Sequence, residues 1–125
     1  MTPDTATSVS LLPNTMSFLA KGNHDMLIGE GWTQAENSET IECLNPYDGS
    51  LLSKVPDASA GDVDRAVAAA RAALEQGEWA TMVPAQRARI LWKVADLIEE
   101  NIDELAERET LDQGKPLYVG RWAEI

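Results

Sequence analysis

The segment from Pro84 to Pro116 constrains the fold more than any other part of the chain. Pro84 suits a first helical position, where its missing N–H would have no partner. Gly114, followed by Lys115 and Pro116, ends the helical pattern. We expect two consecutive helices with a joint near Asn101–Asp103. Apolar residues at spacings of three and four give these helices one apolar side, which needs a partner surface: Leu91, Val94, Ile98, Ile102 and Leu105.

The charge of the chain excludes several classes of function. Ten Lys and Arg residues against 21 Asp and Glu residues give a formal net charge of −11. A surface of this sign repels nucleic-acid phosphates and anionic lipid, so we expect neither a nucleic-acid nor a membrane partner. The first 20 residues contain no Lys or Arg, which argues against a signal or transit peptide. A single cysteine cannot form an internal disulfide, and a cytoplasmic location is the default expectation.

Residues 1–24 are interpreted as an N-terminal arm. Leu12, Met16 and Leu19 fit one face of a short docked helix, and a disordered arm is the alternative. Val9 belongs to the same apolar group of the arm. His24 has no other His and no Cys near it in the sequence, so a packing or surface role is favoured over metal ligation.

Residues 25–56 change to the pattern of short strands. Gly29-Glu30-Gly31 predicts the turn of a β-hairpin, with glycine supplying the positive φ that the turn needs. Asn45 to Gly49 has turn chemistry throughout, and Pro56 closes the last strand. The four expected strands are Met26–Ile28, Trp32–Thr33, Thr40–Leu44 and Leu51–Val55. Cys43 is mid-strand on an inward face, where a small buried hydrophobe is favoured over a reactive thiol.

Residues 59–83 predict one long helix and a linker. Ser59 to Asp62 is the S-x-x-D pattern of a helix start, and the Ala-rich helix continues to about Gln76, with Gly77 as its stop. Trp79 and Met82 are expected to pack in the linker. Val83 occupies the N-cap position of the next helix, where its side chain cannot accept a backbone N–H. Val119, Trp122 and Ile125 have helical spacing, so we expect a final helix that is cut by the end of the chain.

No catalytic constellation emerges from these residues alone. The sequence has no G-x-G-x-x-G, no P-loop and no nucleophile elbow. The carboxylates of Glu99, Glu100, Asp103 and Glu107 are spaced as a solvated helix face rather than as an acid–base pair. We therefore assign no catalytic, cofactor-binding or metal-binding residue from motifs. One interpretation is a free-standing acidic helical module that binds a protein partner through the Leu91–Leu105 stripe.

Four ordered segments resemble the aldehyde dehydrogenase superfamily. Leu44–Gly49 is similar to its "NPATG" turn, and Asp62–Ala73 to its first helix. Trp79, then 87–91 and 95–99, follow in the family's order, and Glu109–Pro116 matches its "ETLDxGKP" segment. The resemblance covers residues 25–125. The arm and Gln113 are more similar to phenylacetaldehyde dehydrogenases than to betaine aldehyde dehydrogenases.

The resemblance implies an α/β fold in which an N-terminal β-hairpin, strands and helices flank an incomplete Rossmann-like cofactor domain. Residues 25–125 would be the N-terminal part of that domain, truncated in a helix. The implied activity is the oxidation of an aldehyde to a carboxylic acid with NAD or NADP, by a longer enzyme that is a homo-oligomer. The family's catalytic Cys, general-base Glu and cofactor loop are downstream of the matched segment. Cys43 is therefore not the nucleophile, and the fragment itself is expected to be inactive.

The resemblance also implies one possible cation site. Some family members bind a monovalent cation through backbone groups at the positions of Cys43 and Leu44 and a carboxylate at the position of Asp112. The alternative is that Asp112 caps the helix or forms a salt bridge in the loop.

Overall fold

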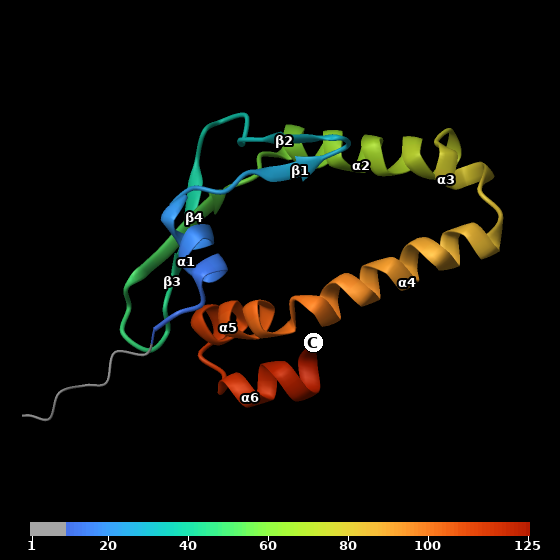
Figure 1. The fold of residues 1–125 in the computed structure, drawn as a ribbon. Helices are drawn as coiled ribbons and strands as arrows, with labels where there is room; N and C mark the ends of the chain where they lie inside the picture. The colour runs from blue at the N-terminus through green and yellow to red at the C-terminus, as the bar shows by residue number, and fades with distance from the viewer. Residues whose placement is uncertain (1–9) are drawn as a thin grey trace, which may run out of the picture.

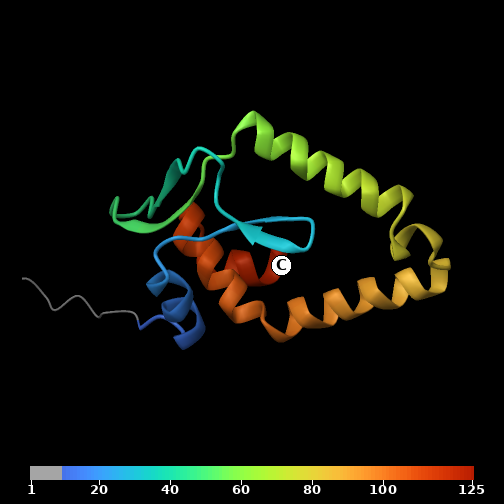
Figure 2. The same cartoon turned by 90° about the horizontal axis from the view of Figure 1, so that it is seen from above.

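The computed structural model describes residues 10–125, in which two separate β-hairpins lie among helices (Figure 1). The helices α2 and α4 lie well apart, on opposite sides of the first hairpin, and are joined through α3 (Figure 2). The elements are α1 (Pro13–Ala20), β1 (Met26–Ile28), β2 (Gly31–Thr33), β3 (Thr40–Leu44), β4 (Leu51–Pro56), α2 (Ala60–Glu75), α3 (Glu78–Thr81), α4 (Pro84–Glu100), α5 (Ile102–Gln113), α6 (Leu117–Val119) and the π-helix η1 (Gly120–Glu124). Val9 and the residues before it lie outside the described part.

The predicted hairpin forms around Gly29–Gly31, and the two strands predicted within residues 40–56 also form and pair as a second hairpin. β1 pairs antiparallel with β2, and Gly29 takes a φ of +63° at their turn. β3 pairs antiparallel with β4, with an irregularity between Cys43 and Leu44. β4 includes Pro56, one residue more than predicted, because a proline is tolerated at a strand end where no ladder N–H is required.

The start of α2 is a complete capping box, as predicted. The Ser59 hydroxyl accepts the Asp62 N–H at 3.2 Å, and the Asp62 carboxylate accepts the Ser59 N–H at 2.8 Å. Asp62 is only 1% exposed and also accepts the N–H of Glu36 at 3.1 Å. Burial alone would raise the pKa of Asp62, but these hydrogen bonds and the charge of Arg65 lower it overall. This carboxylate therefore ties the helix start to the loop that follows β2.

The linker prediction is wrong, because residues 78–81 form the short helix α3. Trp79 belongs to this helix and is 38% exposed, so it packs less closely than expected. A four-residue helix has no room for a 3.6-residue hydrophobic period, which explains why the sequence pattern does not show it.

The long segment forms two helices with the predicted joint. Asn101 separates α4 from α5, and its side-chain amide donates to the Leu97 carbonyl at 2.8 Å. Gly114 ends α5 in the left-handed conformation, with a φ of 72°. The tail is not the single helix that we expected. It is one α-helical turn followed by a π-helix, which packs on α5 where Gly120 faces Ala106.

Little apolar surface is buried in the described part of the chain. Ala35 and Ala106 are its two buried apolar residues, and α4 contains no buried residue. The predicted apolar stripe is therefore exposed along α4, where Leu91 is 60% exposed. Other large apolar side chains exposed on the same helix are Ile90, Trp92, Val94, Leu97 and Ile98. Among residues 10–125, no helix combines the length and the hydropathy that a membrane crossing requires.

We predict that replacing Val83 with Asp stabilises the chain. Val83 is the N-cap of α4 and provides no side-chain hydrogen bond. An Asp carboxylate there would accept a free N–H of the first turn and raise the free energy of unfolding by about 0.5–2 kcal/mol. Urea unfolding followed by circular dichroism measures this change. Val83→Ala is the matched control, and equal stability of the two variants would contradict the assignment of the cap.

The exposed face of α4 generates a second prediction. Contiguous exposed apolar surface promotes association, so the chain should bind a hydrophobic fluorescent dye or self-associate in sedimentation experiments. Leu91→Ser should weaken both effects, whereas Lys93→Ser, on another face of the same helix, should leave them unchanged. A compact, dye-negative monomer would show that this face is satisfied within the chain.

Candidate functional site

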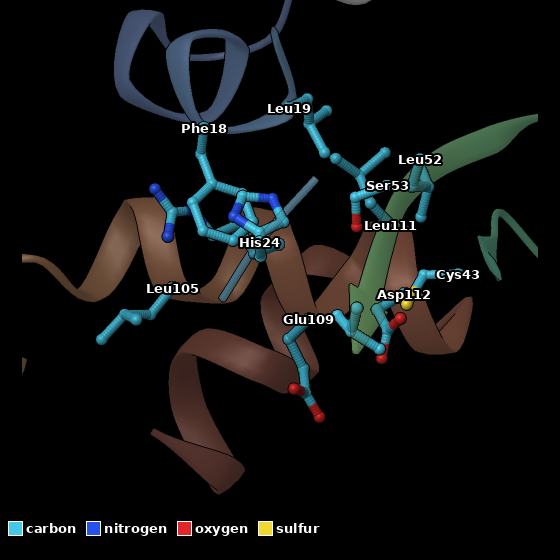
Figure 3. A pocket seen from close by; sticks show the side chains of 12 residues that line it. Phe18, Leu19, His24, Cys43, Leu52, Ser53, Leu105, Glu109, Leu111 and Asp112 are labelled. Carbon is cyan, nitrogen blue, oxygen red and sulfur yellow. The ribbon is translucent and has the colours of Figure 1, made fainter. Parts of the chain in front are cut away.

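A hollow of about 440 Å³ opens between α1, the β3–β4 hairpin and α5 (Figure 3). Apolar side chains from all three elements line it, together with a few polar groups at its ends. The aromatic, sulfur-containing and charged residues of the lining are Phe18, His24, Cys43, Arg108, Glu109 and Asp112. Since two of these residues come from the possible cation site, this hollow is the candidate functional site.

Cys43 and Asp112 meet at one end of the hollow (Figure 3). Cys43 is half-buried rather than buried, so the expected core role is only partly met. Within the described part, no hydrogen bond or ion pair holds the Asp112 carboxylate, and the expectation that it caps or forms a salt bridge is therefore wrong. Lys115 pairs instead with Glu109, at 3.0 Å. Leu44 follows Cys43 at the irregularity of the ladder and is 48% exposed.

The helix α1 docks against α5 through polar contacts at its N-terminal end. The Leu12 N–H donates to both carboxylate oxygens of Glu107, at 3.1 and 3.0 Å. The Asn14 side chain donates to Glu104 at 3.0 Å. Glu107 is therefore half-buried and engaged, and its assignment to a solvated face is wrong because the sequence pattern of α5 gives no information about the docked α1. A carboxylate at a helix N-terminus is also favoured by the helix dipole.

The docked face of α1 differs from the predicted one. The helix itself is confirmed over the disordered alternative, but Met16 is 55% exposed and Leu12 is 38% exposed. Thr15 is fully buried instead. The guanidinium carbon of Arg108 lies 3.8 Å from the centroid of the Phe18 ring. Apolar spacing does not reveal this face, because a hydroxyl and a cation–π contact define it.

His24 completes a three-layer stack with Phe18 and Arg108. Its ring centroid is 4.0 Å from that of Phe18, with an interplanar angle of 17° (Figure 3). At such short distances the imidazole and the guanidinium must occupy opposite faces of the Phe18 ring. Burial, followed by the charges of Lys21 and Arg108, lowers the pKa of His24, and Asp25 partly opposes this effect. The packing role expected for His24 is confirmed.

The hollow shows no catalytic pair. His24 and Cys43 both line it, but no hydrogen bond joins them in the described structure. Residues 10–125 contain no group of three or more His, Cys, Asp or Glu residues that could hold a metal ion. The arrangement can therefore accept an apolar group or a single weakly charged cation beside Asp112, but it provides no activated nucleophile.

Comparison with known proteins shows a family match over most of the chain. The model of the aldehyde dehydrogenase family matches residues 32–125. The phenylacetaldehyde dehydrogenase of Pseudomonas fluorescens is 43% identical over 102 residues, which are 82% of this chain and 20% of that enzyme. Human mitochondrial 10-formyltetrahydrofolate dehydrogenase is 45% identical over 96 residues, which are 77% of this chain and 10% of that enzyme.

A solved structure is similar to this chain in both sequence and fold. The NAD+ complex of an aldehyde dehydrogenase from Bacillus cereus superposes with a TM-score of 0.89 and 41% identity. The superposition covers 94% of this chain and 24% of the Bacillus cereus chain. The present chain therefore spans a quarter or less of the relatives that it matches.

Proposed function

Because the chain belongs to the aldehyde dehydrogenase family, we propose that it forms the N-terminal part of an enzyme that oxidises an aldehyde to a carboxylic acid with NAD. The observation that supports this most strongly is the superposition on the Bacillus cereus enzyme, whose complex contains NAD+. NADP remains an alternative cofactor for the assay to test. Two relatives of similar identity are named for different substrates, so the proposal stops at the aldehyde class.

In this proposal the chain contributes framework rather than chemistry. Residues 25–125 would be the first part of the cofactor-binding domain, and residues 1–24 an arm in front of it. The exposed apolar side of α4 would contact the remainder of the enzyme, since such a face needs a counterpart. We further propose that the full-length enzyme is a homo-oligomer located in the cytoplasm. The free-standing interaction module is set aside, because the whole apolar stripe lies inside the segment that matches the family.

A chimera provides the direct test of this function. We expect the chain alone to form no NADH from any aldehyde. The family's catalytic Cys and general-base Glu follow the segment that this chain matches. Replacing the matched segment of the Pseudomonas fluorescens enzyme with the corresponding residues of this chain should retain NADH formation. Ile98→Asp in the chimera should abolish it, whereas Asp96→Asn should not. Turnover by the isolated chain, or an inactive but folded chimera, would contradict the proposal.

We also propose that a monovalent cation binds beside Asp112. The fit rests on an unpaired carboxylate that faces the hollow next to Cys43 and the irregular backbone at Leu44. One carboxylate with backbone oxygens offers a single negative charge, which suits a monovalent ion better than a divalent one. Bound, such an ion would pin the end of α5 to β3 and would take no part in the chemistry.

The cation proposal predicts a salt-specific gain in stability. Ligand binding to the folded state raises the melting temperature, so the chain should melt higher in sodium chloride than in choline chloride of the same ionic strength. Asp112→Asn should remove the difference, and Asp96→Asn, an exposed control on α4, should keep it. Equal melting temperatures of the unmodified chain in the two salts would rule the site out.

A further inference from the structure

The C-terminal half of α1 packs on α5 through the Phe18 ring. At its N-terminal end α1 is fastened by the contact of Leu12 with Glu107, and at its other end by the packing of Phe18 on Arg108. Thr15, between these two contacts, is fully buried, yet its hydroxyl has no hydrogen-bond partner in the described structure. Docking of the C-terminal half of α1 therefore rests on the surroundings of one aromatic ring.

His24 holds the second face of that ring from a fixed position. The chain reverses at Gly22, whose φ is +70°, and then pairs with β4. The His24 N–H donates to the Lys54 carbonyl at 2.9 Å, and the Lys54 N–H donates to the Gly22 carbonyl at 2.7 Å. These backbone bonds hold the His24 backbone beside β4. From this position its imidazole stacks on the Phe18 ring.

The docked position of His24 favours a neutral imidazole over an imidazolium. The Nε2 atom of His24 is buried and has no hydrogen-bond partner among residues 10–125. A neutral ring can carry its proton on Nδ1, whereas an imidazolium must donate from both nitrogens. Protonation would therefore bury a charged donor without an acceptor, and such a donor is more costly than a broken hydrogen bond in solvent.

The charged groups around His24 add to this preference. Lys21, just after α1, and Arg108, on α5 across the Phe18 ring, both act against a positive imidazole. On α5, Glu104 pairs with Arg108 and Glu109 with Lys115. Asp112 lines the same hollow, but it is not among the groups that shift the pKa of His24. From β4, the Lys54 ammonium pairs with Glu42. Asp25 alone favours the cation, and its carboxylate already accepts a hydrogen bond from Gln34.

We propose that the His24–Phe18 stack is a pH-operated latch, in which protonation of His24 releases α1 from α5 and uncovers the hollow. Phe18 and Leu19 line one side of the hollow, so the release of α1 removes that side. The latch is independent of the proposed enzymatic function, because it requires only this chain.

The direction of the pH effect is set by linkage. The docked state lowers the pKa of His24 from its ordinary value of 6.5, so the undocked state binds the proton more tightly. The contribution of neutral His24 to docking is therefore fully present above pH 6.5. This contribution decreases below that pH and is lost once the pH has fallen through the lowered pKa of the docked state.

The sequence itself makes the test clean, because His24 is the only histidine. In the tag-free 125-residue chain, an NMR titration from about pH 7.5 to about pH 5 follows one imidazole signal through this range. We expect the α1 amides to shift with the same midpoint and to lose their hydrogen-exchange protection. The amides of α2 serve as the internal control and should not change.

Variants distinguish the latch from a general loss of structure. His24→Gln should remove the pH transition of α1 whether it leaves the helix docked or free. Lys21→Gln should raise the midpoint, whereas Asp25→Asn should lower it, because these groups act on His24 with opposite signs. The proposal is overturned if His24 titrates while the α1 amides remain protected, or if the α1 transition persists at the same midpoint in His24→Gln.

Discussion

A shortage of buried apolar surface governs this structure. In the described part only Ala35 and Ala106 are buried apolar residues, and both are small. The longest helix, α4, presents its apolar stripe to solvent along its whole length. Helices of this length are marginal in water without tertiary packing. In the proposed function, this stripe is the surface that contacts the remainder of the enzyme.

Polar contacts fix the relative positions of the elements in place of a large core. Asp62 joins the start of α2 to the loop after β2, and Glu107 holds the start of α1. Arg121 pairs with Asp103 at 3.1 Å and helps to hold the tail against α5. Asp103 and Glu107 belong to α5, which is polar in sequence, whereas Asp62 belongs to the Ala-rich helix α2. This arrangement explains how a chain with a net charge of −11 uses some of its acidic residues as structural anchors.

The elements that local signals define could be predicted from the sequence. The turn at Gly29, the capping box at Ser59 and the helix end at Gly114 each depend on residues within one turn of chain, and all three are confirmed. The docked face of α1 and the engagement of Glu107 could not be predicted, because both depend on α5, far away in sequence. The candidate site divides in the same way. Asp112 stands out through its motif, whereas the Phe18–Arg108 contact has no local signature.

Amide hydrogen exchange along α4 tests the central claim most directly. That claim is that α4 gains most of its stability from a surface outside this chain. The α4 amides should therefore exchange rapidly in the isolated chain and become protected when the same residues are placed in the full-length chimera. Equal protection of α4 in both contexts would show that the helix is stable alone and would contradict the claim.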